Sequence, residues 1–502
     1  MTSSAAEPRQ LVLHGHFYQP PREDPWTGTV PRQPGAAPYH DWNERITAEC
    51  YAPNTAVGVA TGDQDFVVNL FDHLSFNVGP TLLSWMEVHH REVYDRILAA
   101  DRRAGRAIAQ AYGHAILPLC NERDLRTQVR WGIADFRHRF GRAPQGMWLP
   151  ETAVSDAALS VLAEEGIRFT ILAPGQIAAV RPLDASDTEW GHHGLAPHEG
   201  LGPLEADDPD ADPVPLDITR ALRWQHPTRP DLGVELVVYD GALAHALAFA
   251  APSADDIVAA ALAHEDGAGA MVAAATDGET FGHHHKGAEH EVARALTAVA
   301  PAHGVETPRL VDLLDAQPPT HEAMVHVSAW SCAHGVGRWM TACGCRTGGE
   351  PGWTQDWRAP LRAALDLLRD WGGERFEQTR GQLLHDPWAA RDAYLDVLLG
   401  ARTWDDFSSE HVVGDHHLAG LLLDAQRNAL LMYTSCGWFF NDLAGIETVQ
   451  VLRYAARAID LYEQAGEQPP VEEFLKVLAG AVSNDPEVGD GRALWFDEVL
   501  PH

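Results

Sequence analysis

The sequence predicts an α/β fold, either a parallel barrel or a distorted one, followed by an all-α helical domain. Up to about residue 320, short apolar runs alternate with Ala-rich helical stretches, which is typical of parallel strands connected by helices. From Trp353 onward the apolar residues recur with helical spacing, and no clear strand pattern follows. We therefore expect a barrel-type domain over residues 1–320 and a helical domain over residues 321–502.

Strands and helices of the first domain follow from the same alternation. Two amphipathic segments, Ser155–Glu165 and Ser253–His264, are typical of the connecting helices, and the first opens at Ser155, a favourable N-cap, and ends at Gly166. The six strand candidates are Leu11–His14, Ala107–Tyr112, Met147–Leu149, Phe169–Leu172, Val234–Tyr239 and Met271–Ala275.

Residues 181–230 interrupt this alternation. They are rich in Pro, Asp, Gly and His, which predicts an inserted loop or lid over the sheet. In the helical domain, which we expect to contribute to the pocket, the predicted helices are Leu361–Trp371, Ala389–Leu399, His417–Met432, Thr448–Gln464 and Val471–Val482.

The charge balance limits the partners. The chain has 37 Lys+Arg against 71 Asp+Glu, a net charge of −34. This argues against nucleic acid and anionic membranes, which are bound through Lys and Arg, and favours a neutral polyhydroxylated or small polar substrate. The first residues show no basic start followed by an apolar run, and the six cysteines are sparse, so we expect a cytoplasmic protein. Nothing in the sequence predicts the oligomeric state.

Chemically active residues follow five of the strand candidates. In a parallel α/β fold the carboxyl ends of the strands share one face, and that face holds the functional site. Any one of these residues could instead be a helix cap, but their coincidence favours a site. They are His14 and His16, then His114, Glu151, Asp240, and finally Asp277 with Glu279.

Glu151 and Asp277 form the pair on which the chemistry depends. Cleavage of a glycosidic bond needs one carboxylate as nucleophile and a second carboxyl group as acid and base, about 5–5.5 Å apart in retaining enzymes. Trp148 and Phe281, their neighbours in sequence, could supply apolar walls for sugar rings, although Trp148 could equally pack in the core.

At these residues the chain resembles glycoside hydrolase family 57, which comprises amylases, glucanotransferases and branching enzymes. Two motifs match fully, Trp-Leu-Pro-Glu at Trp148–Glu151 and Asp-x-Glu-x-Phe-Gly-His at Asp277–His283. A His-x-His-Gln-Pro motif resembles His14–Pro20, with Phe17 and Tyr18 inserted before Gln19. The remaining two motifs are looser, at Gly113–Leu119 and near Ser328–Trp339.

The resemblance implies an incomplete (β/α)7 barrel followed by a helical domain, and a retaining enzyme acting on α-1,4-glucan or maltooligosaccharides without a cofactor. Glu151 would be the nucleophile and Asp277 the acid/base. Hydrolysis of the α-amylase type is the first expectation, and transfer by a 4-α-glucanotransferase or branching enzyme is the alternative. The residues expected to bind substrate are His14, His16, Gln19, His114, Trp148, Asp240, Glu279, His283, Trp330 and Arg338.

Other interpretations remain open. His14, His16, Asp277 and residues 283–285 could hold a metal, as in a carbohydrate deacetylase on a related barrel. A non-catalytic glucan-binding protein is disfavoured, because both carboxylates are present. A second group, Cys332, His334, Cys343 and Cys345, invites a zinc interpretation, but the ligands within each pair are closer in sequence than is usual. We favour a tight Gly-rich loop there, and we predict no metal site.

Overall fold

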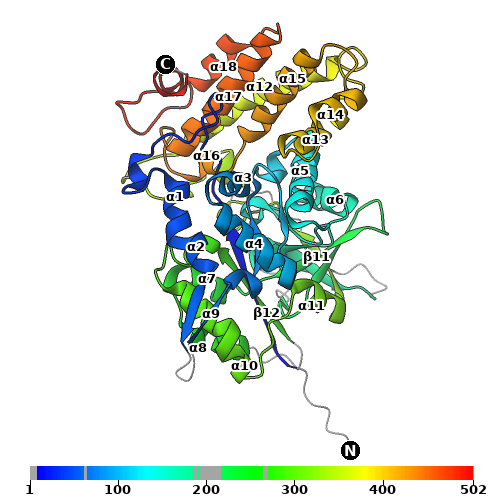
Figure 1. The fold of residues 1–502 in the computed structure, drawn as a ribbon, viewed down its shortest axis with the longest axis vertical. Coiled ribbons are helices and arrows are strands. Elements are labelled where there is room, and N and C mark those ends of the chain that lie inside the picture. The colour runs from blue at the N-terminus through cyan, green and yellow to red at the C-terminus, as the bar shows by residue number, and fades with distance from the viewer. Residues whose placement is uncertain (1–7, 61–64, 185–189, 193–215, 264–269, 501–502) are drawn as a thin grey trace, which may run out of the picture.

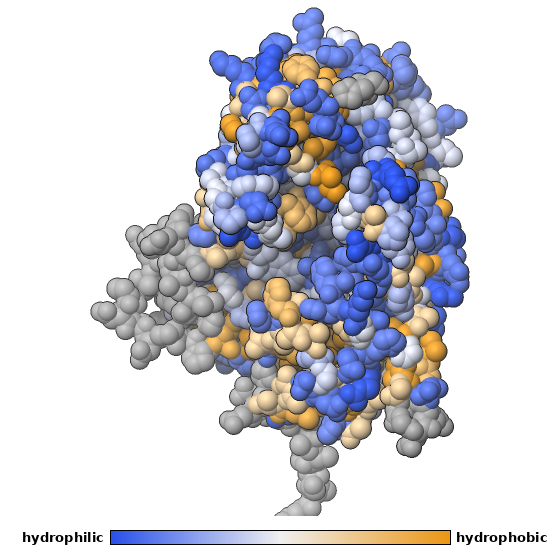
Figure 2. Space-filling model, turned by 90° about the vertical axis from the view of Figure 1, so that its left-hand side faces the viewer, coloured by the Kyte–Doolittle hydropathy of each residue, from blue (hydrophilic) through white to orange (hydrophobic). Residues whose placement is uncertain are grey.

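The computed structural model describes residues 8–60, 65–184, 190–192, 216–263 and 270–500. Figure 1 shows an elongated molecule with the α/β part below and helices α12 to α18 above. Hydrophilic residues cover most of the face shown in Figure 2, as the charge balance leads one to expect. No helix among the described residues is long and apolar enough to cross a membrane.

Seven parallel strands form an arc in the α/β part. In spatial order they are β12 (Met271–Asp277), β1 (Gln10–Phe17), β4 (Ser75–Val78), β5 (Ala109–Gln110), β6 (Met147–Trp148), β7 (Phe169–Leu172) and β11 (Gly233–Val238). The first and last strands are joined by a hydrogen bond from the Asp240 amide to the Ala273 carbonyl (2.7 Å), without a paired ladder. This is the incomplete (β/α)7 barrel that the resemblance implies.

All six predicted strands are present, although β5 and β6 are shorter than expected. The seventh strand, β4, was not predicted, because its four residues include the polar Ser75 and Asn77. Further strands extend the sheet or form a hairpin: β2 (Val57–Ala60), β3 (Asp65–Val68), β8 (Ile177–Pro182), β9 (Gly191–His192), β10 (Leu222–Gln225) and β13 (His321–Val325). Strand β10 lies inside residues 181–230, which we predicted as a loop or lid, whereas residues 185–189 and 193–215 of that interval lie outside the described residues.

Helices cover the outside of the strands. Ser155 accepts a hydrogen bond from the Ala158 amide (3.2 Å) at the start of α6, and Gly166 after its end has φ of 81°, so the predicted cap and stop are both confirmed. The helices of this part are α1 (Trp42–Ile46), α2 (Ala52–Asn54), α3 (Pro80–His89), α4 (Arg91–Ala104), α5 (Glu122–Phe140), α6 (Asp156–Glu164), α7 (Gly241–Ala250), α8 (Ala254–Ala263), α9 (Ala288–Arg294), α10 (Ala300–Ala302) and α11 (Leu310–Ala316).

The remaining part of the chain is helical, and residues 353–500 contain no strand. All five predicted helices are present. Helix α14 was missed, because its sequence WDDFSSEH offers few apolar residues to mark a buried face. The helices are α12 (Arg358–Gln378), α13 (Pro387–Leu398), α14 (Trp404–His411), α15 (His416–Leu431), α16 (Cys436–Phe439), α17 (Ile446–Gln464), α18 (Val471–Leu478) and α19 (Gly491–Leu494).

The helical part shares its core with the barrel. The buried apolar cluster that contains the residues of α12 to α18 also includes Tyr112, Trp131 and Ala153 from the α/β part. The Trp131 indole N–H donates to the carbonyl of Arg391 in α13 (3.0 Å), and Arg391 itself pairs with Asp124 in α5 (2.8 Å). Helices α5 and α13 therefore pack as neighbours within one continuous interior.

Candidate active site

The site begins with two histidines on β1. His14 and His16 are two residues apart on one strand, so their side chains lie on the same face. Both are buried, and both rings stack on the Trp148 indole at the end of β6, with ring centroids 4.9 Å apart in each case. The Trp148 ring is fully buried, which favours the packing role over a sugar platform.

Asn77 on β4 joins the two histidines. Its Oδ1 accepts from His14 Nε2 (3.0 Å), and its Nδ2 donates to His16 Nδ1 (2.9 Å) and to Gln110 Oε1 (2.8 Å). His16 Nε2 lies 3.1 Å from His114 Nε2, and His114 Nδ1 lies 2.7 Å from Ser435 Oγ. Hydrogen bonds thus run from Asn77 on β4 through His16 on β1 and His114 after β5 to Ser435 in the helical part.

The histidines in this network are neutral. Burial lowers the pKa of both His14 and His16 to about 3 and that of His114 well below its ordinary value. Because Asn77 occupies His16 Nδ1 as a donor, the proton of His16 is on Nε2 and points at His114. His114 then carries its proton on Nδ1 and donates it to Ser435, whose hydroxyl is free to donate onward.

The Ser435 hydroxyl lies close enough to Glu151 to lower the pKa of its carboxyl group as a hydrogen-bond donor. The backbone has a left-handed conformation at Glu151, which follows β6 (φ 57°), and at His114, which follows β5 (φ 53°). Such a conformation costs about 1–3 kcal/mol at a residue other than glycine and is concentrated at functional sites. The Trp330 amide holds the strained turn by donating to the Glu151 carbonyl (3.0 Å).

The Glu151 carboxylate is held by donors from the segment after β13. Its Oε2 accepts from Ser331 Oγ (2.6 Å) and Trp330 Nε1 (3.1 Å). Burial raises its pKa, whereas these hydrogen bonds, the bond from Ser435 and the positive charge of the buried Arg338 oppose the rise. Burial outweighs them, so the pKa of Glu151 lies above its ordinary value, while the donors orient its carboxylate.

Asp277, at the end of β12, has different surroundings. Its side chain is exposed to solvent, although many protein atoms lie around it. Burial raises its pKa well above the ordinary value, and the negative charges of Glu279 and Glu151 raise it further. Its charge in turn helps to raise the pKa of Tyr239, next to it at the end of β11. Two carboxyl groups whose surroundings separate their pKa values are suited to nucleophile and acid.

Glu279 lies two residues after Asp277 and contacts Tyr18 and Tyr51. It accepts from the Tyr51 hydroxyl (2.5 Å) and the Tyr18 amide (3.0 Å), and burial raises its pKa to about 7. The Tyr18 ring stacks on His114 (3.7 Å), and its hydroxyl contacts Thr434 Oγ1 (2.7 Å), beside Ser435.

The structure brings most of the predicted site residues together. One contacting group is formed by His14, His16, His114, Trp148, Trp330 and Glu151. The charge of Arg338 lowers the pKa of Glu151, and the charge of Glu151 raises the pKa of Asp277. Gln19 is buried nearby and accepts from Arg22 (2.9 Å).

Two predicted residues have other partners. Asp240 caps α7, accepting from the amides of Ala242 (2.8 Å) and Leu243 (2.9 Å). His283 pairs with Glu49 (2.5 Å). His285 also points elsewhere, to the Ala248 carbonyl (2.9 Å), so neither His283 nor His285 is turned toward Asp277, and no group of metal-ligating side chains among the described residues includes Asp277.

Four residues of the site were missed. Asn77 lies in the unpredicted strand, whereas Tyr239 and Ser331 adjoin the predicted Asp240 and Trp330 and could have been found by extending those motifs. Ser435 lies between α15 and α16, 321 residues from its partner His114, and no local pattern marks it.

We expect Ser435→Ala to lower kcat by about 10²-fold, the usual cost of one oriented donor at a reacting group. Because the lost hydrogen bond lowers the pKa of Glu151, the acid limb of the pH–rate profile should move to higher pH. Ser483→Ala is the matched control, since Ser483 is buried in the same helical part but donates to Asp442 (2.7 Å). Equal effects of the two variants on kcat and on the profile would contradict this role for Ser435.

The barrel and its pair of unlike carboxyl groups define a glycoside hydrolase or transferase. Residues 104–321 match the model of glycosyl hydrolase family 57, and residues 353–502 match a domain of unknown function, DUF3536. Over residues 104–321 the chain is thus similar to glycosyl hydrolase family 57. No curated protein matches it.

Solved structures share the fold at low sequence identity. An exo-type maltose-forming amylase from Pyrococcus sp. ST04 has a TM-score of 0.71 and 12% identity, over 93% of this chain and 82% of that one. An alpha-amylase from Thermotoga maritima has a TM-score of 0.56 and 12% identity, over 97% and 99%. A family 57 branching enzyme from Thermococcus kodakaraensis has a TM-score of 0.54 and 15% identity, over 94% of each chain.

Proposed function

We propose that the protein cleaves α-1,4-linked glucan or maltooligosaccharides by double displacement, with Glu151 as nucleophile and Asp277 as acid and base. The observation that carries the proposal is the contrast between the two carboxyl groups. Glu151 is surrounded by donors and a cation, whereas no donor or cation among the described residues opposes the rise in the pKa of Asp277. The amylases and the branching enzyme among the similar structures support the substrate class.

In the first step a Glu151 oxygen attacks the anomeric carbon while the bond from that carbon to the glycosidic oxygen breaks. Asp277 gives its proton to the departing oxygen. In the second step Asp277 takes a proton from water or from a sugar hydroxyl, whose oxygen attacks the same carbon and releases Glu151. Two inversions retain the α configuration.

The indole N–H of Trp330 would bind the sugar beside Glu151, and Arg338 would offer a further donor close to that carboxylate. Every ring nitrogen of His14, His16 and His114 has a protein partner, so these imidazoles would act on the site by orienting Ser435. A neutral glucan suits a strongly acidic chain, since no phosphate has to approach it. We place the activity in the cytoplasm, a reducing compartment, on the ground that none of the six cysteines forms a disulfide.

Product analysis on maltooligosaccharides, glycogen and starch tests the proposal. New reducing ends of α configuration indicate hydrolysis. Longer and shorter oligosaccharides without new reducing ends indicate transfer, and α-1,6 linkages indicate branching. Release of acetate from an acetylated oligosaccharide, with no reaction on the three glucans, would contradict the proposal and favour a deacetylase.

Glu279→Gln is expected to move the alkaline limb of the pH–rate profile to lower pH. The negative charge of Glu279 raises the pKa of Asp277, so its removal lets Asp277 lose its proton at lower pH. Only the protonated form of Asp277 can assist the leaving group, and activity should therefore fall sooner as the pH rises. The exposed Glu92→Gln serves as control, and an unchanged alkaline limb in Glu279→Gln would contradict the assignment.

A further inference from the structure

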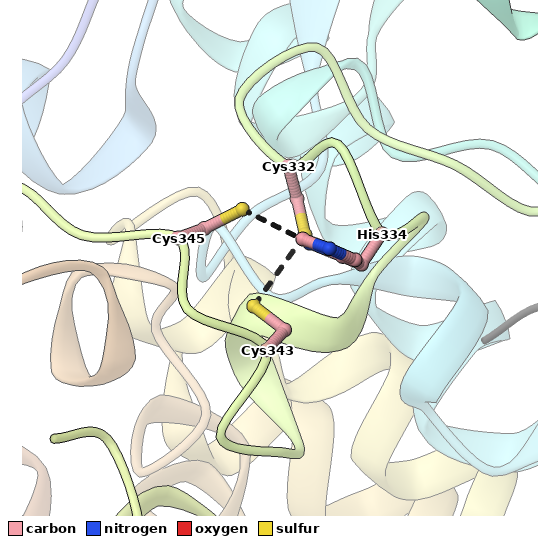
Figure 3. A group of neighbouring side chains, drawn as sticks. All are labelled: Cys332, His334, Cys343 and Cys345. Atoms are coloured by element: carbon pink, nitrogen blue, oxygen red, sulfur yellow. Dashed lines mark hydrogen bonds between the residues drawn. The ribbon is translucent and has the colours of Figure 1, made fainter. Parts of the chain in front are cut away.

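Four side chains outside the carboxylate pair converge on one point. Cys332, His334, Cys343 and Cys345 each offer one ligand atom, and these atoms all lie within 4.8 Å of one another. Figure 3 shows the four side chains pointing toward a common centre. The Sγ atoms of Cys332 and Cys343 are 4.0 Å apart, and His334 Nδ1 is 3.4 Å from Cys345 Sγ.

These separations fit a tetrahedral metal site. With Zn–S of about 2.3 Å and Zn–N of about 2.0 Å, neighbouring ligand atoms of a tetrahedron lie about 3.5–3.8 Å apart. A disulfide needs its sulfurs at about 2.05 Å, far closer than the pair here. Three thiols and an imidazole are a ligand set that zinc prefers, because it takes sulfur and nitrogen donors in tetrahedral geometry.

The chain reaches this geometry through two tight turns. Gly335 after His334 has φ of 69°, and Gly344 between Cys343 and Cys345 has φ of 85°, a conformation that favours glycine. The turns let ligands one residue apart face the same centre. The usual separation of two to four residues within a pair of zinc ligands applies to loops without such turns. The sequence therefore argues against a metal here, whereas the four ligand atoms lie close enough together to bind one.

The surroundings suit a group with negative charge. Three thiolates and one Zn²⁺ carry a net charge of −1, and two buried arginines lie beside them. The Arg338 amide donates to Cys332 Sγ (3.3 Å), as backbone amides do to metal-bound thiolates, and Arg358 donates to the Cys345 carbonyl (3.0 Å). The Nε atoms of both guanidinium groups are buried without a hydrogen-bond partner among the described residues.

We propose that Cys332, His334, Cys343 and Cys345 bind one structural zinc ion. All four coordination positions are filled by the protein, so the ion is closed to substrate. Binding releases the three thiol protons to solvent and links the two ends of the segment of residues 332–345. That segment begins directly after Trp330 and Ser331, which hold the Glu151 carboxylate, and the ion would thus keep these donors in place.

Metal analysis of the full chain, purified without a metal-binding tag or chelator, tests the site independently of any glycosidase activity. We expect about one zinc per chain in the unmodified protein. The same content is expected in Cys120→Ser, a control cysteine outside the group, whose Sγ donates to the Ile116 carbonyl (3.6 Å). Cys332→Ser with Cys343→Ser should lose the zinc, whereas His334→Cys should keep it, because a fourth thiolate replaces the imidazole.

A second measurement covers the case in which the double variant does not fold. The unmodified protein is titrated with a mercurial reagent in the presence of a chromogenic zinc indicator. Zinc should appear in step with modification of three thiols, and the melting temperature should fall by several degrees. An unmodified, folded protein that contains no zinc and takes none up after incubation with zinc sulfate and dialysis would overturn the proposal. So would a Cys332–Cys343 disulfide in that protein.

Discussion

Glu151→Ala is expected to lower kcat on α-glucans by at least about 10⁴-fold, as removal of a nucleophile does in other enzymes with covalent intermediates. The loss concerns chemistry rather than folding. Alanine is smaller than glutamate, and the turn keeps its backbone hydrogen bond from Trp330. Glu165→Ala is the control, because Glu165 pairs with Arg126 on the outside of the barrel (3.1 Å) and is far from the site in the fold.

Azide should restore part of the activity of Glu151→Ala on an activated aryl α-glycoside. The anion enters the space that the carboxylate leaves and attacks the anomeric carbon from the same side, so the product is a glycosyl azide of inverted, β configuration. Undiminished activity of the variant, or an azide product of retained configuration, would contradict the nucleophile assignment.

Asp277→Asn is expected to lower kcat/KM on natural glucan by at least about 10³-fold, within the range for loss of general acid catalysis. The effect on the glycosylation step of an activated aryl glycoside should be small, because a phenolate of low pKa leaves without a proton. Azide should now give the retained, α azide, since Glu151 still forms the intermediate. The measurement is a pair of rate constants, one for each kind of leaving group.

Equal losses on both kinds of substrate would show that Asp277 acts structurally. Asp312→Asn controls for the change of charge, because Asp312 pairs with Arg309 at the surface. Together the Glu151 and Asp277 variants separate the two roles by the configuration of the azide product as well as by rate.

The barrel could be predicted because its strands are marked by apolar runs that end in reactive residues. Met271–Ala275 and Phe169–Leu172 are buried on both faces, and a continuous apolar run is the signature of such a strand. Strand β4 lacks this signature because Asn77 points into the network with His14 and His16. Asn77, whose polarity keeps β4 from being predicted as a strand, is thus a residue of the candidate site.

The sequence predicts that the helical domain contributes to the pocket, but not which residue makes the contribution. Ser435 reaches His114 and Glu151 only because the α15–α16 turn docks against the barrel, where the Ser435 amide donates to the His114 carbonyl (2.9 Å). Sequence patterns within a helix report its buried face and not what its ends touch. Asp240 shows the converse, since it follows its strand as a site residue should and caps α7.

The continuous interior between barrel and helices bears on how this chain can be recombined. The two family models divide it between residues 321 and 353, yet Trp131 of the first part is buried among side chains of the second. A chimaera joined at that boundary would combine the barrel of one protein with the helices of another, and their buried side chains would not pack against each other. Glu151 would also lose the Ser435 donor. The transferable module is therefore the barrel together with its own helices, and any exchange between relatives has to carry α5 and α13 as a matched pair.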